Sequence, residues 1–227
     1  MPASHALRTA VCAAALCLCV QAQDTPGNPA QTNPAPTNQA KGMPPRATPA
    51  EYQTQAQAGT VTIAAEFKGH SVPTMQGPLS TEDYVVVETA LFGPPEARIK
   101  LSAEDFSLRI NGKKAPLPSQ PYGLVVGSVK DPEWEPPVAV EKKSKGGLSG
   151  GGKGDQGDST PAPVKIPIEV QRAMAQRVQK ASLPEGDRAL PQAGLLFFQF
   201  RGKPQNIHSI ELIYTGTAGK ATLALQP

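Results

Sequence analysis

The chain has 227 residues, 25 of them Pro and 21 Gly, with few aromatic residues (5%) and a formal net charge of only +3. Because Pro and Gly interrupt helix interiors, this composition excludes a long coiled coil and a helical repeat array. The balanced charge lacks the dense basic face that nucleic-acid binding requires, so no nucleic-acid partner is predicted.

Residues 1–22 have the three parts of a secretory signal. Arg8 supplies the positive start, and the stretch from Thr9 to Val20 is apolar. Val-Gln-Ala at the end of the segment then places small or short residues at positions −3 and −1 of a signal-peptidase cleavage site. The apolar stretch is shorter than the about 20 residues of a bilayer-spanning helix, which favours a cleaved signal over an anchor. We predict cleavage between Ala22 and Gln23, export to the periplasm or the outside, and no membrane span in the mature chain.

All three cysteines lie in that apolar stretch, at Cys12, Cys17 and Cys19. The small residue that precedes a lipid-modified Cys in bacterial lipoproteins is missing before Cys17 and Cys19. Lipid attachment is disfavoured but stays open. After cleavage the chain has no Cys, so we predict no disulfide, no thiolate nucleophile and no Cys metal site.

Residues 23–59 are rich in Pro, Ala, Thr, Gln and Asn and contain almost no large apolar side chain. Such a composition cannot bury a core, and Pro biases its neighbours to extended backbone. We predict a disordered, partly polyproline-like spacer over this segment.

From residue 60 the pattern changes to alternating apolar and polar residues, which predicts β-strands. Asn111-Gly112 predicts a tight hairpin, because both residues accept a positive φ. Strands are expected in two blocks, roughly 60–130 and 187–227, at 60–67, 84–92, 98–101, 106–110, the less regular 124–129, 195–200, 207–215 and 220–225.

A Gly/Lys/Pro-rich segment, residues 131–186, separates the two blocks. Its middle is of low complexity and is predicted to be a solvated linker, although a tail for an acidic polymer stays open. Residues 169–181 have helical spacing, with Val170, Met174 and Val178 on one face. We expect this helix to dock on the sheet, with a membrane or an outside partner as the alternative.

These elements predict an all-β fold for residues 60–227: an antiparallel β-sandwich of about 7–8 strands. The strands are short and their turns tight, which disfavours parallel crossovers. Neither block alone forms a pair of layers, so the second block is expected to complete a core begun by the first. Residues 131–186 then form a loop insertion.

Four features follow one another along the chain: an apolar strand, a Leu-Ser…Asp-Phe segment, a glycine hairpin and a late apolar strand. The residues that carry them are Leu101, Ser102, Asp105, Phe106, Gly112, Phe198 and Tyr214. On these features, about half of the chain resembles small immunoglobulin-like domains of unknown function in exported bacterial proteins and lipoproteins. The resemblance implies an immunoglobulin-like form of the β-sandwich and no catalytic residue.

No set of residues for catalysis, metal binding or cofactor binding stands out, and none is predicted. His208 is expected on the apolar face of a strand, and His70 in a solvated loop. Glu82-Asp83 and Glu104-Asp105 are expected to be solvated turn residues or caps. A hydrolase would require His208 to meet an acid and a hydroxyl in a cleft.

Trp134 stands among prolines and charges at the start of the insertion, where it can close one end of the fold or grip a ligand. Together with Tyr122 it is the candidate ligand contact. The sequence favours a non-enzymatic interaction or structural module of the cell envelope, whose partner is an unidentified envelope protein or polymer. The alternative is an accessory domain that binds carbohydrate or peptide near Trp134 and the insertion helix.

Overall fold

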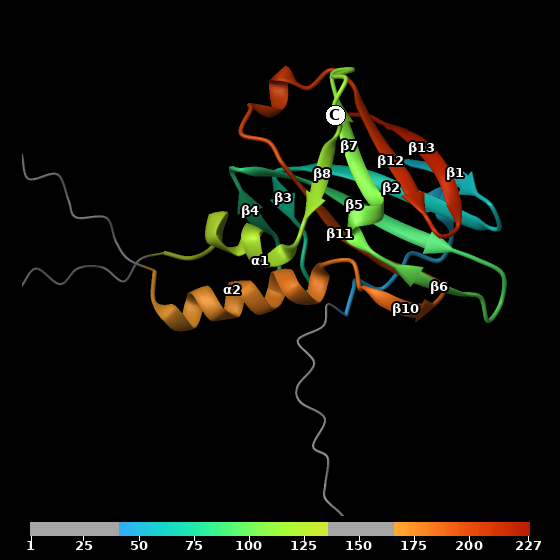
Figure 1. Ribbon diagram of the computed structural model, residues 1–227. Helices are drawn as coiled ribbons and strands as arrows, with labels where there is room; N and C mark the ends of the chain where they lie inside the picture. The colour runs from blue at the N-terminus through green and yellow to red at the C-terminus, as the bar shows by residue number, and fades with distance from the viewer. Residues whose placement is uncertain (1–40, 136–165) are drawn as a thin grey trace, which may run out of the picture. The chain divides into compact units, whose positions relative to one another are not determined.

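A computed structural model describes residues 41–135 and 166–227, which belong to one unit (Figure 1). The predicted signal, its cleavage site at Ala22 and Gln23, residues 23–40 of the predicted spacer and the low-complexity middle of the insertion lie outside the described residues.

The described chain is mostly β-structure, as predicted. The strands are β1 (Thr54–Ala58), β2 (Val61–Gly69), β3 (Ser71–Val72), β4 (Leu79–Thr81), β5 (Tyr84–Phe92), β6 (Arg98–Leu101), β7 (Phe106–Ile110), β8 (Leu117–Gln120), β9 (Val129–Lys130), β10 (Gly186–Ala189), β11 (Gln192–Gln199), β12 (Ile210–Gly216) and β13 (Gly219–Leu225). The helices are α1 (Tyr122–Val125) and α2 (Ile168–Ala181), with 3₁₀ turns η1 (Pro49–Glu51), η2 (Ala103–Asp105), η3 (Val126–Ser128) and η4 (Pro204–Asn206).

Eight strands form one antiparallel sheet in the order β1-β2-β5-β11-β8-β7-β12-β13. The sheet curls until its first and last strands, β1 and β13, lie beside each other (Figure 1). No ladder pairs these two edges in the described ranges, but the Gln53 side chain donates to the carbonyl of Gln226 at 3.0 Å. The sheet is therefore close to a closed barrel, with one seam.

Strands from both sequence blocks alternate in this sheet, because β11 lies between β5 and β8 while β12 pairs with β7. The concave face encloses the larger core. Phe106 and Tyr214 pack there with ring centroids 4.9 Å apart, and Phe198 is fully buried. Period-two burial along β7 and β12 matches the alternation in their sequences.

The convex face of the sheet carries a second core, so β5 is buried on both sides. Val85 and Val87 face the concave core, while Val86 faces the convex one. Met174 and Val178 of α2 cover the convex face. The small sheet β3-β4-β9 and the α1–η3 turn complete this outer layer (Figure 1).

Several predicted elements agree closely with the structure. β5, β6 and β7 have the predicted bounds, and α2 begins one residue before the predicted helix. Asn111 and Gly112 have φ angles of 53° and 65°, as the hairpin requires. No helix in the described ranges is long and apolar enough to cross a membrane.

The spacer prediction is wrong for residues 41–59. Met43 bridges to Ala193 of β11, and Thr54–Ala58 form β1, which pairs with β2. The polar composition is misleading here because Tyr52 and Ala58 supply buried contacts. Gly59, with φ of 61°, turns the chain from β1 into β2.

The predicted strand at 124–129 is also wrong. After Pro121 the chain forms α1 and then η3, and only Val129 and Lys130 continue into a strand. The β-branched residues suggested a strand, but a helical turn lets Val125 enter the convex core beside α2. The Ser128 hydroxyl supports this turn by donating to the carbonyl of Val125 at 2.9 Å.

Candidate functional site

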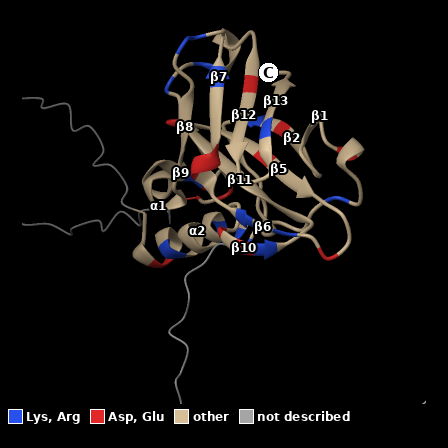
Figure 2. Ribbon diagram, turned by 45° about the vertical axis from the view of Figure 1, so that its right-hand side comes forward, with Lys and Arg blue, Asp and Glu red and all other residues tan. Residues whose placement is uncertain are grey.

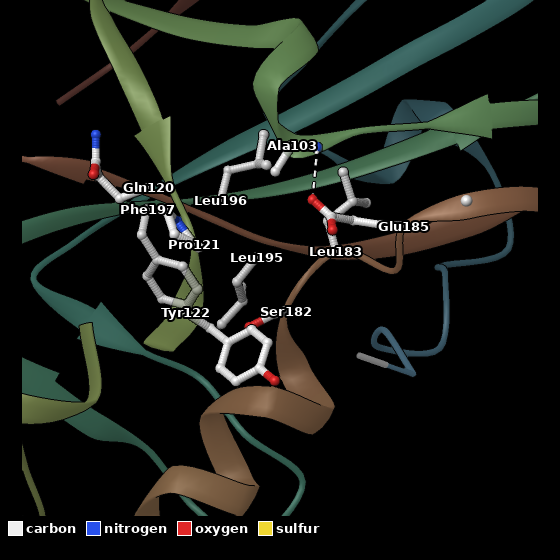
Figure 3. A pocket seen from close by; sticks show the side chains of 11 residues that line it. Ala103, Gln120, Pro121, Tyr122, Ser182, Leu183, Glu185, Leu195, Leu196 and Phe197 are labelled. Atoms are coloured by element: carbon white, nitrogen blue, oxygen red, sulfur yellow. Dashed lines mark hydrogen bonds between the residues drawn. The ribbon is translucent and has the colours of Figure 1, made fainter. Parts of the chain in front are cut away.

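A cleft of about 370 Å³ opens beside β11. We call it the β11 cleft (Figure 3). Its floor is apolar, and its walls come from η2, the β8–α1 junction and the segment that follows α2. The lining residues are Ala103, Gln120, Pro121, Tyr122, Ser182, Leu183, Glu185, Gly186, Leu195, Leu196 and Phe197.

The cleft exists because two different segments share one edge of β11. β8 pairs with β11 only at Phe197 and Phe198. Further along the same edge, Ser182 bridges to Leu195, and the N–H of Leu183 donates to the carbonyl of Leu195 at 3.0 Å. The β11 cleft lies between these two segments and is lined by residues of both.

Gly194 brings the 182–183 segment close to β11. A methyl group at this position would overlap the main chain of Leu183 and Ser182. Only glycine leaves room for this approach, which fixes one wall of the cleft. The cleft thus depends on a contact between backbones.

The polar groups in the lining are mostly hydrogen-bonded within the protein. The Glu185 carboxylate accepts from the backbone N–H of Ala103 at 3.3 Å (Figure 3). With partners outside the lining, the Ser182 hydroxyl donates to the carbonyl of Val178 at 2.7 Å, and the Gln120 amide donates to the carbonyl of Pro118 at 3.3 Å. The remaining surface is formed by Leu195, Phe197 and the Tyr122 ring. An apolar surface with a few fixed polar groups suits binding of an apolar group.

A second cavity, of about 250 Å³, lies at the other end of α2. It is lined by Lys130, Asp131, Trp134, Ile166, Val170 and Met174. We call it the Trp134 pocket. The Asp131 carboxylate pairs with Arg177 of α2 at 2.7 Å, and Arg177 also donates to the carbonyl of Gly77 at 3.0 Å. This half-buried pair holds α2 to the segment that carries Trp134.

The two predicted ligand contacts lie in different cavities. Tyr122 lines the β11 cleft and Trp134 lines the pocket named after it. The remaining cleft residues gave no signal in the sequence, because Leu195 and Phe197 are ordinary strand residues. Glu185 and Gly186 belong to the predicted insertion, and only the fold brings them to β11.

Both histidine expectations need correction. His70 is half-buried rather than solvated, with Nδ1 2.7 Å from the carbonyl of Tyr84 and Nε2 3.3 Å from that of Gly202. His208 is exposed and precedes β12, so it does not lie on an apolar face. Its backbone N–H donates to the side-chain oxygen of Asn111 at 2.7 Å. Neither histidine lines the β11 cleft or the Trp134 pocket.

None of the four residues of the acidic pairs lines either cavity, although Glu82 pairs with Lys130 of the Trp134 pocket. Partial burial, with the neighbouring Glu104 carboxylate, raises the pKa of Asp105, while a hydrogen bond from Lys130 lowers the pKa of the exposed Glu82. Within residues 41–135 and 166–227, no three His, Cys, Asp or Glu side chains gather in a way that could hold a metal ion.

Comparison of the chain with protein-family models, curated proteins and solved structures finds no match.

Proposed function

We propose that this protein is an exported, non-enzymatic binding module of the bacterial cell envelope, which holds an apolar group of its partner in the β11 cleft. The partner is another envelope protein or an envelope polymer. The observation that carries the proposal is the cleft itself: an open, mainly apolar cavity with its floor on β11 and its walls from three further segments.

Two features support binding rather than catalysis. Among the described residues that line the cleft, Glu185 is the one carboxylate, and it accepts a backbone hydrogen bond from Ala103. The two described histidines, either of which could supply a general base, lie elsewhere. Export of the chain remains a proposal that rests on the pattern of residues 1–22.

The finer description of the fold, an immunoglobulin-like sandwich, is also proposed. Its support is that the sheet consists of two well-paired groups, β1-β2-β5-β11 and β7-β12-β13. They are joined through β8, which pairs with each group at only two positions. The two groups then act as facing layers around the concave core.

The cleft can be tested with a neutral aromatic amine, N-phenyl-1-naphthylamine, whose fluorescence rises in apolar sites. The full chain is expected to bind it at one site. Ala103→Phe, which puts a ring into the cleft, is expected to weaken binding at least about tenfold. Lys114→Phe, on the exposed β7–β8 hairpin, is the matched control and is expected to bind normally. Equal binding by both variants would refute the cleft as the site.

A second candidate function, binding of carbohydrate or a peptide, is favoured by the Trp134 pocket. The indole lines this pocket together with Val170 and Met174 of α2, so an aromatic surface and apolar side chains face the same cavity. Because the chain has a single Trp, its fluorescence reports on this pocket directly. A saturable change on titration with a soluble glycan or a proline-rich peptide would support this function, and an unchanged spectrum across such a panel would contradict it.

A further inference from the structure

Residues 41–52, which we call the latch, cross the convex face of the sheet just before β1. The latch passes over β11, β5 and β2 in turn, touching Ala193, Glu88 and Glu66. The next residue is Gln53, whose side chain accepts from the backbone N–H of Phe67 at 3.3 Å and donates to the carbonyl of Gln226 at 3.0 Å. Gln53 therefore fixes the point at which the latch joins the barrel.

A patch of small residues receives the latch. Ala64, Ala90 and Ala193 on three neighbouring strands form a floor under the Tyr52 ring. Tyr52 is 6% exposed and meets Phe92 edge-on, with ring centroids 6.1 Å apart. The three methyl groups leave room for one aromatic ring, so this contact is complementary in shape.

Four charged side chains hold the latch to the sheet. Glu66 and Glu88 lie directly opposite each other on β2 and β5. Arg46 of the latch bonds both carboxylates, and its guanidinium lies 4.4 Å from the centre of the Tyr52 ring. Lys68 also pairs with both, at 2.6 Å to Glu66 and 3.1 Å to Glu88. Figure 2 shows acidic and basic residues close together on β2 and β5.

Without the latch this arrangement is unbalanced. Two carboxylates facing each other across strands repel, and Lys68 alone supplies a single positive charge. The Glu88 side chain is only 8% exposed, so an unpaired charge there is costly. Arg46 brings the second positive charge. The latch therefore completes the ion network on β2 and β5, and the ion network in turn holds the latch on the sheet.

The backbone contributes little to this attachment. In the described part of the chain, the latch pairs with the sheet at Met43 and Ala193, whose N–H and carbonyl are 2.8 Å apart. β5, in contrast, pairs along its length with both β2 and β11. A segment with few backbone bonds to its surroundings opens locally at a lower free energy than a central strand does.

We propose that residues 41–52 form a releasable latch, which opens as a unit when Arg46 no longer pairs with the carboxylates of Glu66 and Glu88, while the barrel stays folded. Release uncovers the alanine floor and frees the segment that connects the barrel to residues 1–40. The charged and titratable groups that face the pair are Arg46 and Lys68, with Tyr52 and Glu51 beside them.

The pKa of Glu66 is shifted in the direction that release of the latch in acid requires. Burial alone would raise the pKa of Glu66, but hydrogen bonds from Lys68 and Arg46 outweigh it and hold the pKa below its usual range. A carboxylate with a lowered pKa in the folded state stabilises the fold above its unfolded-state pKa, and this contribution is lost as the pH falls. Acid therefore weakens the latch and does not strengthen it.

The test is hydrogen exchange of the full chain at about pH 7, resolved to the latch and to β5 and β11. Glu66→Gln with Glu88→Gln removes the negative charge but keeps side-chain shape, and leaves Arg46 and Lys68 to repel each other. We expect exchange in residues 41–52 to rise about tenfold or more, with β5 and β11 unchanged. Arg46→Met, which alters no residue of the barrel, is expected to have the same effect.

Arg98→Met is the control, because it breaks an ion pair with Asp187 whose side chains are 56% and 65% exposed. It is expected to leave latch exchange unchanged. The proposal is overturned if the latch keeps its protection in both Arg46→Met and the double Gln variant. It is also overturned if the latch and β5 exchange together in the unaltered chain, since the latch would then open only with global unfolding.

Discussion

The two faces of the main sheet are stabilised in different ways. The concave face is closed by apolar side chains from strands that lie far apart in sequence, such as Phe106, Phe198 and Tyr214. The convex face is covered by added segments, α2 and the latch, which are held in part by Arg177 and Arg46. Apolar packing is insensitive to pH and non-directional, whereas buried ion pairs fail when one partner loses its charge. We therefore expect the concave core to set global stability and the convex layer to respond to changes of pH.

The largest expected effect is on the concave core. Phe198→Ala removes a fully buried ring from β11 and leaves a cavity that neighbouring strands cannot fill. It is expected to lower the free energy of unfolding by about 3–5 kcal/mol, measured by urea denaturation. Met174→Ala, on the convex side, tests the comparison: if it costs as much and unfolds the chain in the same single transition, the two faces are not distinct.

Gly194→Ala changes the close contact between β11 and the 182–183 segment beside the β11 cleft. Its methyl group would overlap the main chain of Leu183, so the 182–186 segment has to move away from β11. We expect a loss of about 1–3 kcal/mol in the free energy of unfolding, together with weaker binding of N-phenyl-1-naphthylamine. Full retention of both properties would show that the cleft wall is not fixed by this contact.

Hydrogen-exchange protection is expected to depend on pH differently in the latch and in the barrel. As the pH falls below the usual range of a Glu carboxyl, protonation of Glu66 removes a partner of Arg46 and Lys68. Hydrogen-exchange protection of the latch, corrected for the intrinsic rate, is expected to fall before that of β5. In the variant that combines Glu66→Gln with Glu88→Gln, the difference in hydrogen-exchange protection between the latch and β5 should no longer depend on pH. A latch that gained protection in acid would contradict the assigned ion network.

The smallest expected effect concerns a polar group inside the concave core. Thr89 of β5 is fully buried, and its hydroxyl has no hydrogen-bond partner among the described residues. Thr89→Val keeps the volume and removes the unpaired hydroxyl. It is expected to raise the free energy of unfolding by up to about 1 kcal/mol, measured by thermal and urea unfolding. A loss of stability would indicate that Thr89 makes a bond that the structure does not show.

Local patterns predicted the strands well where one face is buried. Phe106, Leu108 and Ile110 alternate with polar residues, and the observed burial has the same period. The Asn111-Gly112 hairpin follows from the φ angles that these two residues tolerate. Both features are set by residues close in sequence, which explains why the sequence alone could reveal them.

The features that failed depend on distant contacts. Val125 enters a helical turn because α2 lies beside it, and Tyr52 is ordered because three alanines on separate strands receive its ring. The β11 cleft was not predicted, apart from Tyr122, because it lies between two segments that share one edge of β11. No local pattern records where two such segments meet a strand.

Two separate sequence blocks share one sheet, with β11 between β5 and the strands that lead to β12. Solution NMR of the labelled chain can detect this arrangement without a ligand or a variant. We expect backbone NOEs that link Leu195 to Glu88 and Leu212 to Leu108. A spectrum in which residues 192–225 show NOEs within the β12–β13 hairpin but none to residues 84–110 would contradict it.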